Sequence, residues 1–139
     1  RLEHVAISNG IEFINDSKAT NIESVIVAIK AFDRPIVLLL GGYNKKSNFR
    51  LLLPHIKSNH VRAIISYGEA GGQINTALGD AVRLVREANL KSAVNKAQIL
   101  AKPGELVLLS PGCASFDEFS NFEERGNFFK KTVYELSHK

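Results

Sequence analysis

The amino-acid sequence predicts a single α/β domain built around a mostly parallel β-sheet. The chain has 139 residues, a usual size for one domain with a buried core. Short apolar runs of strand length alternate with stretches whose apolar residues recur at helical spacing. Turn residues separate the two kinds of stretch, and no repeat, linker or low-complexity segment interrupts them. Strands that alternate with helices form a parallel sheet with helices on both faces.

The elements are expected in a regular order. Strands are predicted at 2–8, 11–15, 36–40, 61–66, 81–85 and 106–110. Helices are predicted at about 20–32, 49–56, 70–78, 90–101 and 120–136. The sheet would therefore have about six strands in a Rossmann-like arrangement, and the first two would form an N-terminal antiparallel hairpin.

The first elements follow from turn and cap signals. Asn9-Gly10 lies between two apolar stretches and is a strong signal for a two-residue hairpin. Thr20 and Glu23 form a capping-box pattern at the start of the first helix. Pro35 ends that helix, and the unbroken apolar run after it is typical of a strand buried on both faces. Gly41-Gly42 ends this strand, and a weaker helix follows.

The second half of the chain repeats the pattern of strand and helix. Pro103-Gly104 turns the chain between a helix and the last buried strand. Ser120 and Glu123 form a second capping-box pattern, so the final helix is expected to begin there. The apolar stripe of that helix consists of Phe122, Phe129, Val133 and Leu136.

Composition and charge exclude several classes of protein. Apolar residues make up 45% and charged residues 23% of the chain, as in ordinary globular proteins. The net charge is +4, and no more than two basic residues adjoin, which argues against nucleic-acid binding. No apolar run is long enough to cross a membrane. The single cysteine, Cys113, and the lack of a signal-peptide pattern lead us to expect a cytoplasmic protein.

Four polar, glycine-rich segments each follow a predicted strand. They are 16–21, 41–48, 67–72 and 111–115. Ligands of such sheets bind in the crevice beyond the carboxyl ends of the strands. In the first segment, Lys18 and two hydroxyl residues precede a capped helix and are able to hold an anion. Capping by Ser17 and Thr20, with Lys18 simply exposed, explains this segment about equally well.

The other segments lack common catalytic motifs. Lys46-Ser47 resembles the end of a phosphate-binding P-loop, but both required glycines are missing. A basic loop able to meet a carboxylate remains. Cys113 has neither a base nor metal-ligand spacing nearby in the sequence and is expected to be a structural thiol. Ser115 lacks the Gly-x-Ser-x-Gly context of serine hydrolases and suits ligand binding better.

Three segments resemble the signatures of one protein family. They are 15–21 with Ser24, 108–126, and 39–42 with Lys45 and Phe49. Together with residues 1–5, they resemble the C-terminal domain of the Mur ligases that add D-glutamate, over essentially the whole chain. The first two signatures are specific, because sibling Mur ligases and folylpolyglutamate synthases carry a different sequence at the first position.

The resemblance implies an ATP-dependent, ADP-forming amide ligase of bacterial peptidoglycan synthesis. Such an enzyme has three domains, and the N-terminal UDP-binding and central ATPase domains are absent from this chain. The alanyl carboxylate of UDP-N-acetylmuramoyl-L-alanine is phosphorylated, and the amine of D-glutamate then attacks the acyl phosphate. ATP and Mg²⁺ would be held mainly by the central domain. We expect a monomer, and we expect the isolated domain to be inactive.

The resemblance also implies which residues bind D-glutamate. Thr20 and Lys45 would bind one carboxylate, while Ser115 and the main chain near Phe122 would bind the other. Two carboxylates need two separate sets of donors, and a fixed spacing between the sets rejects other amino acids.

A second group of residues is implied to face the nucleotide. Asp16 and Lys18 would lie toward ATP and the acyl phosphate, as the catalytic groups of this domain, and Arg1 would reach ATP from the hinge between domains. Positioning of the amine on a line to the acyl carbon would be the main contribution of the domain to catalysis.

Two alternatives stay open. The chain is also compatible with the same domain of a sibling Mur ligase or a folylpolyglutamate-type ligase, which would take a different amino acid. A stand-alone module that binds a small anion or nucleotide without catalysis is the other alternative. The third signature departs from the family at Asn44, Lys46 and Asn48, so the resemblance leaves open whether Lys45 or Lys46 meets the substrate.

Overall fold

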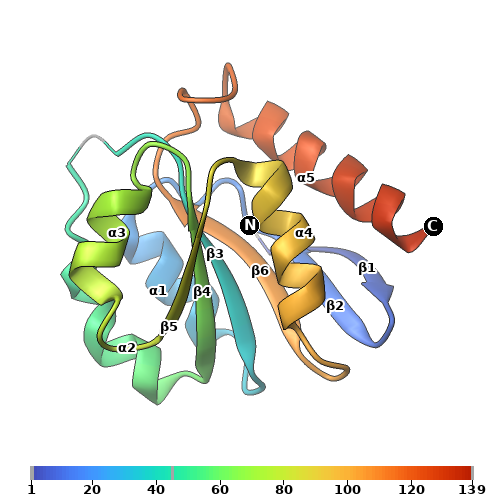
Figure 1. The fold of residues 1–139 in the computed structure, drawn as a ribbon, viewed down its shortest axis with the longest axis horizontal. Coiled ribbons are helices and arrows are strands. Elements are labelled where there is room, and N and C mark those ends of the chain that lie inside the picture. Colours follow the sequence, from blue (N-terminus) through green and yellow to red (C-terminus); the bar gives the residue numbers. More distant parts are fainter. Residues whose placement is uncertain (1, 45, 139) are drawn as a thin grey trace.

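The computed structural model has the predicted α/β architecture (Figure 1) and describes residues 2–44 and 46–138. Within those ranges, six strands form one sheet in the order β1-β2-β6-β3-β4-β5. The strands are β1 (Glu3–Ser8), β2 (Ile11–Asn15), β3 (Ile36–Gly41), β4 (Val61–Tyr67), β5 (Arg83–Glu87) and β6 (Leu106–Gly112). β1 pairs antiparallel with β2, whereas every other neighbouring pair is parallel. The expected N-terminal hairpin on a mostly parallel sheet is therefore confirmed.

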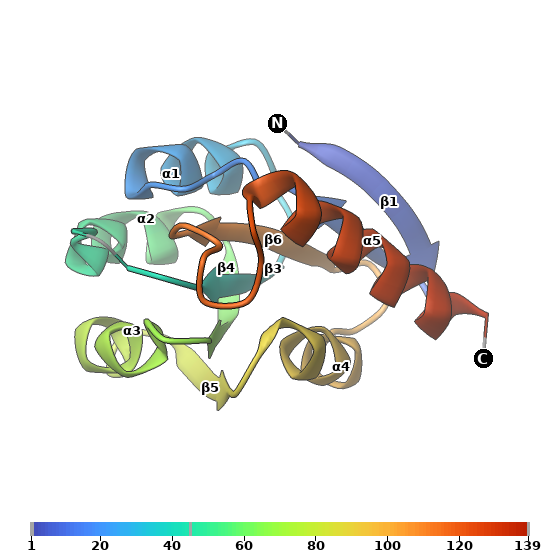
Figure 2. The same cartoon turned by 90° about the horizontal axis from the view of Figure 1, so that it is seen from above.

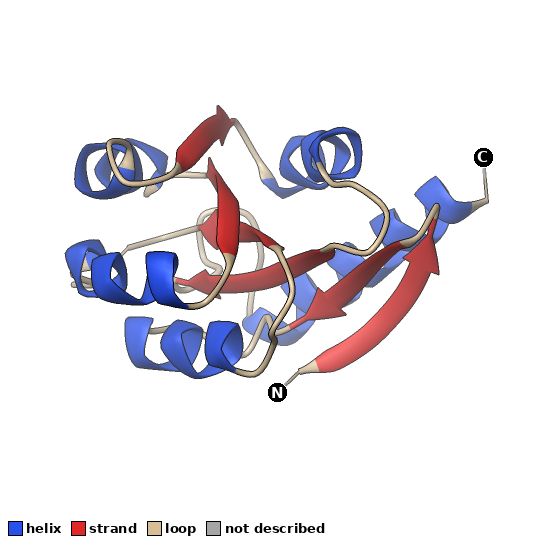
Figure 3. Ribbon diagram, turned by 90° about the horizontal axis from the view of Figure 1, so that it is seen from below, coloured by secondary structure: helices blue, strands red, loops and turns tan. Residues whose placement is uncertain are grey.

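Helices cover both faces of the sheet (Figures 2 and 3). They are α1 (Ile22–Lys30), the short 3₁₀ helix η1 (Phe49–Leu52), α2 (Leu53–Ser58), α3 (Gly71–Leu78), α4 (Leu90–Leu100) and α5 (Phe122–Ser137). α1, η1, α2 and α3 contribute to the core on one face, and α4 and α5 to the core on the other. None of the helices within 2–44 and 46–138 combines the length and apolar character that crossing a membrane requires.

Strand β3 shows why both faces must be covered. All six of its residues are buried, and successive side chains point to opposite faces of the sheet. Leu38 and Leu40 pack in the core that includes α1, whereas Val37 and Leu39 pack in the core that includes α4. A continuous apolar run such as this one is stable as a strand only between two layers of helices.

The strand order fixes the place of the ligand crevice. From β3 the chain runs outward through β4 to β5 and then returns by α4 to β6, on the other side of β3. The chain therefore leaves neighbouring strands β3 and β6 in opposite directions along the sheet. Ligands of such sheets bind beyond the strands at a point of this kind. Just beyond these strands, Tyr43 and Ala114 exchange two backbone hydrogen bonds of 2.9 and 3.1 Å. This bridge holds the loops after β3 and β6 side by side.

Both predicted capping boxes are wrong by one residue. Asn21, not Thr20, caps α1, because its side chain accepts from the third N–H of the helix at 2.9 Å. Asn121, not Ser120, caps α5 through the same contact at 2.8 Å. Asparagine is at least as favourable as serine or threonine at this position, so a neighbouring asparagine takes the cap. The hydroxyl of Thr20 is consequently not used in capping.

The second predicted helix and the fifth predicted strand also differ from the prediction. The helix predicted at 49–56 is divided into η1 and α2, and Pro54 lies in the first turn of α2, where proline is tolerated. The strand predicted at 81–85 begins two residues later, because a turn follows α3 and Ala81 donates its N–H to the carbonyl of Leu78 at 3.0 Å. β5 is an edge strand and is only half buried.

Candidate functional site

The loops at the carboxyl ends of the strands meet because two glycines allow close approach. A Cβ on Gly41 would lie 2.1 Å from the carbonyl oxygen of Tyr67, and one on Gly42 would lie 2.5 Å from that of Ala114. Gly42 also has a φ of +119°, which favours glycine. The pair therefore ends β3 and lets the loop after it lie directly against the loops after β4 and β6.

One cleft of about 360 Å³ opens between the segments after β2, β3 and β6 and the start of α5. Three residues implied to bind D-glutamate line it, namely Thr20, Ser115 and Phe122. Thr20 is exposed, whereas Ser115 is buried at the base of the loop after β6. The side chain of Ser47 also lines the cleft and donates to the carbonyl of Gly112 at 3.1 Å. We call this space the amino-acid cleft, after the residues that the resemblance implies to bind D-glutamate.

The structure describes only part of the basic loop that follows β3. Lys45 lies outside the described residues, as does Arg1. Lys46 is exposed and is not among the residues that line the amino-acid cleft. The side chain of Asn44 shapes the loop: it accepts from the N–H of Ser47 at 2.7 Å and donates to Gln73 at 2.5 Å.

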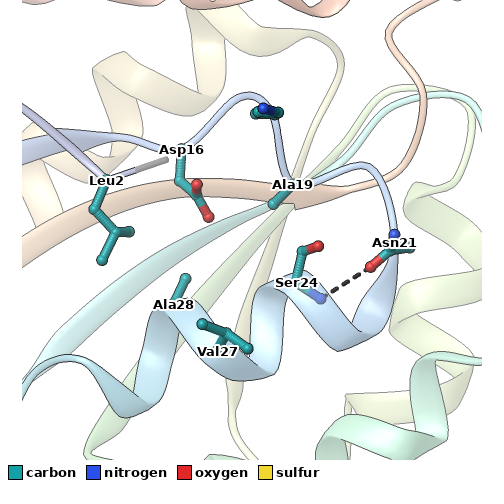
Figure 4. A pocket seen from close by; sticks show the side chains of 8 residues that line it. Leu2, Asp16, Ala19, Asn21, Ser24, Val27 and Ala28 are labelled. Carbon is teal, nitrogen blue, oxygen red and sulfur yellow. Dashed lines mark hydrogen bonds between the residues drawn. The ribbon is translucent and has the colours of Figure 1, made fainter.

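A second cleft of about 550 Å³ lies between the segment after β2 and α1 (Figure 4). Asp16 and Lys18, implied to face the nucleotide, both line it. Asp16 is buried, and its carboxylate accepts from the hydroxyl of Ser110 at 2.8 Å. Leu2 and Val27 supply an apolar side, and Val27 is 69% exposed. We call this space the nucleotide cleft, after the residues that the resemblance implies to face the nucleotide. The described members of the two implied groups line different clefts, but Lys18 and Phe122 also line a further cleft together.

Sequence reasoning missed the residue that connects these loops. Arg125 is only 1% exposed. Its Nε and Nη2 donate to the hydroxyl and carbonyl oxygens of Ser17 at 2.9 and 2.7 Å, and its Nη1 donates to the carbonyl of Cys113 at 2.9 Å. The signal was present, because Arg125 precedes Phe129 by four residues and so interrupts the apolar stripe of α5 with a charge.

Ser17 is part of the same network and is not a helix cap. Its side chain is buried, and its hydroxyl donates to the carbonyl of Phe122 at 2.7 Å while it accepts from Arg125. We call Arg125, Ser17, Cys113 and Phe122 the Arg125 network. It joins the segment after β2, the loop after β6 and the first turn of α5.

Two ionisable groups near the amino-acid cleft have shifted pKa values. Burial raises the pKa of the Cys113 thiol to about 12, against the opposing charge of Arg125. A thiol in this state is a poor nucleophile, and this agrees with the structural role expected for Cys113. Burial also raises the pKa of Glu118, although a hydrogen bond from the N–H of Leu90 to the carboxylate opposes the shift.

The carboxylates, histidines and the thiol do not gather into a metal site in the described part of the chain. Within 2–44 and 46–138, no three of these side chains are close enough to share a metal ion. The clefts are lined by hydroxyl side chains and the Lys18 ammonium group, which suit anionic groups, and also by the carboxylates of Asp16 and Glu123.

Comparison with known proteins places the chain in one family. Residues 1–113 match the family described as Mur ligase, glutamate ligase domain. The chain is similar to UDP-N-acetylmuramoylalanine–D-glutamate ligases of Acidobacterium capsulatum (46% identity over 139 residues) and Chlamydia felis (42% over 136 residues). The alignments cover 100% and 98% of this chain but 30% and 32% of those relatives. The chain thus spans about a third of the length of the curated relatives it matches.

Solved structures show the same fold at low sequence identity. A UDP-N-acetylmuramoyl-L-alanyl-D-glutamate–2,6-diaminopimelate ligase superposes with a TM-score of 0.65 at 12% identity, over 100% of this chain and 32% of that one. FolC of E. coli, solved with ADP and without folate substrate, gives 0.62 at 19% identity, over 96% and 32%.

Proposed function

Since the chain belongs to the Mur ligase family through its glutamate ligase domain, we propose that it is the amino-acid-binding third of a D-glutamate-adding ligase. The complete enzyme would join D-glutamate to UDP-N-acetylmuramoyl-L-alanine with hydrolysis of ATP to ADP, in the synthesis of bacterial peptidoglycan. The observation that carries this proposal is 46% identity to a relative of that name over all 139 residues. The bacterial sources of the relatives and the need for ATP favour the cytoplasm as its compartment.

In this proposal the amino-acid cleft holds the two carboxylates of D-glutamate. Thr20 and Lys45 would bind one of them, and Ser115 with the main chain at Phe122 would bind the other. Thr20 and Ser115 lie on different segments of the same cleft, so the distance between the donor sets is fixed by the fold. A fixed distance selects a five-carbon dicarboxylate, because a shorter or singly charged amino acid leaves one donor set unpaired.

The nucleotide cleft would lie toward ATP and the acyl phosphate. Lys18 would place its ammonium group near the phosphates and the acyl phosphate, where negative charge accumulates. Asp16, held by Ser110, has a fixed orientation and would accept hydrogen bonds from hydroxyl groups of the nucleotide. Leu2 and Val27 fit an apolar part of the ligand, and Arg1 would also lie toward ATP.

Mg²⁺ would be held outside the described residues. Lys18, which lines the nucleotide cleft, is a cation and would bind phosphate oxygens and not the ion. The ion would neutralise phosphate charge from the N-terminal side of the enzyme, in the central domain. What this chain supplies is binding and orientation of the amine relative to the acyl carbon.

The test is release of phosphate by the complete enzyme, in the presence of ATP and UDP-N-acetylmuramoyl-L-alanine. Phosphate release should depend on D-glutamate, and Ser115→Ala should raise the KM for D-glutamate at least about tenfold while the KM for ATP changes less than about twofold. Lys131→Ala, on the exposed side of α5, is the control and should leave both values unchanged. A comparable rise in both KM values for Ser115→Ala would contradict the assignment of the cleft.

The same assay separates the alternative functions. A sibling ligase would release phosphate with L-glutamate, L-lysine or meso-diaminopimelate in place of D-glutamate. A non-catalytic module would release none with any of the four amino acids. We also expect the 139-residue chain alone to be inactive, because it carries no Gly-x-x-x-x-Gly-Lys-Ser/Thr sequence.

A further inference from the structure

Arg125 is the largest of the fully buried side chains, and it is charged. Its three hydrogen bonds are to residues in two other segments. Ser17 is 108 residues away in the sequence, and Cys113 is 12 residues away. None of the ion pairs among residues 2–44 and 46–138 includes Arg125. A buried cation whose partners are carbonyls and a hydroxyl is costly unless every contact is made.

The segments that Arg125 joins are the ones that carry the donors of the amino-acid cleft. Ser17 lies three residues before Thr20, and Cys113 lies two residues before Ser115. Through the hydroxyl of Ser17, the network also reaches the carbonyl of Phe122 at 2.7 Å. Thr20, Ser115 and Phe122, the proposed donors that line the cleft, are thus each within three residues of an atom in the Arg125 network.

From this geometry we propose that Arg125 is a positioning residue for D-glutamate, an inference that rests on the proposed function of the amino-acid cleft. Arg125 does not line the cleft. It holds Thr20, Ser115 and Phe122 at the spacing that two carboxylates require, by fixing the three segments to one planar guanidinium group. Lysine keeps the charge but cannot form three hydrogen bonds in this forked geometry.

Arg62 offers a matched control at the opposite edge of the sheet. It also donates three hydrogen bonds, to both carboxylate oxygens of Glu105 at 2.8 and 2.7 Å and to the carbonyl of Leu100 at 2.9 Å. It lies at the start of β4, away from both clefts. Arg62→Lys therefore perturbs a similar network without touching the proposed site.

The experiment compares Arg125→Lys and Arg62→Lys in the complete enzyme, with D-glutamate-dependent phosphate release as the readout. For Arg125→Lys we expect the KM for D-glutamate to rise about tenfold or more and the KM for ATP to change less than about twofold. For Arg62→Lys both values should stay within about twofold of wild type. Arg125→Gln, which also removes the charge, should raise the KM for D-glutamate further.

Ser17→Ala is the milder variant and applies if Arg125→Lys does not fold. It removes only the hydroxyl that connects Arg125 to Phe122, so a rise of about threefold in the KM for D-glutamate is expected, again without a change for ATP.

Different results overturn different claims. An unchanged KM for D-glutamate in the folded Arg125 or Ser17 variants, or an equal rise for ATP, would overturn the positioning role alone. The same selective rise in Arg62→Lys would overturn it too, because loss of any arginine that donates three hydrogen bonds would then suffice. A wild-type enzyme without D-glutamate-dependent phosphate release would overturn the proposed function and this inference with it.

Discussion

Arginine has opposite roles at the amino ends and the carboxyl ends of the parallel strands, which we call the amino edge and the carboxyl edge of the sheet. At the amino edge, Arg62 forms an ion pair with Glu105, so its charge is neutralised within the fold. At the carboxyl edge, Arg125 is more deeply buried and donates only to Ser17 and Cys113. At the amino edge, both charges are thus paired within the fold. The carboxyl edge keeps a positive charge beneath a cleft that we propose binds a dianion.

Glu105 at the amino edge and Glu118 at the carboxyl edge have pKa values shifted in opposite directions. At the amino edge, burial opposes ionisation of Glu105, but hydrogen bonds from Arg62 and from the N–H of Lys102 outweigh it and lower the pKa. At the carboxyl edge, burial dominates and raises the pKa of Glu118. The ionised form is therefore favoured for Glu105, which has an arginine partner, and disfavoured for Glu118, for which burial is the largest influence.

The largest expected effect is on the rate at which Cys113, which lines the amino-acid cleft, is alkylated. With a pKa of about 12, the thiol should react with iodoacetamide about a thousandfold more slowly at pH 8 than the same chain in urea. A cysteine placed at exposed Lys102 in a Cys113→Ser background is the control at the amino edge, and should react almost equally fast with and without urea. Rapid alkylation of folded wild type would show that the carboxyl edge opens readily.

Removal of each arginine measures what the two networks contribute to stability. Arg125→Met should lower the free energy of unfolding by about 3 to 4 kcal/mol, because buried carbonyls of Ser17 and Cys113 lose their donors. Arg62→Met should cost about 2 kcal/mol, because the pair is partly exposed and Glu105 keeps a hydrogen bond from Lys102. Urea unfolding of the 139-residue chain gives both values. The reverse order would contradict the comparison.

Helix caps at the carboxyl edge give a smaller effect. Asn21→Ala should lower the free energy of unfolding by about 1 kcal/mol, because a backbone N–H of the first turn of α1 loses its acceptor. Thr20→Val should change it by less than about 0.5 kcal/mol, since Thr20 does not cap the helix. The same urea measurement applies, and an equal loss in both variants would restore the cap to Thr20.

Glu105 and Glu118 should contribute to the pH dependence of stability with opposite signs. Glu105 has a lowered folded pKa, so it stabilises the fold above its unfolded pKa, and this stabilisation is lost as the pH falls through the folded pKa. Glu118 has a raised folded pKa, so protonation at falling pH relieves a cost of burial. Glu105→Gln should flatten the acid loss of stability and Glu118→Gln should steepen it, as followed by urea unfolding between about pH 3.5 and 7. Equal slopes in both variants would show that the edges do not differ.

The sequence by itself determined the features that depend on near neighbours. The apolar run at 36–40 could only be a strand covered on both faces, and Asn9-Gly10 could only be a tight turn. The alternation of strands and helices placed every polar segment at one edge of the sheet. The signature around 15–21 indicated the family, which the comparisons confirm. Even so, Thr20 and Asn21 are both good caps, and local propensity did not distinguish them.

Only the tertiary structure decided which of those segments touch. β6 lies between β2 and β3, so residues 16–21 and 113–115 become neighbours although almost a hundred residues separate them. The fold places Asp16 and Lys18 on one cleft and Thr20, Ser115 and Phe122 on another. The contact also gives Arg125 partners that no local pattern indicates. The reason is physical. Turns, caps and periodicity are set by interactions over a few residues, whereas the burial of a charged group depends on where its distant hydrogen-bond acceptors lie once the core has formed.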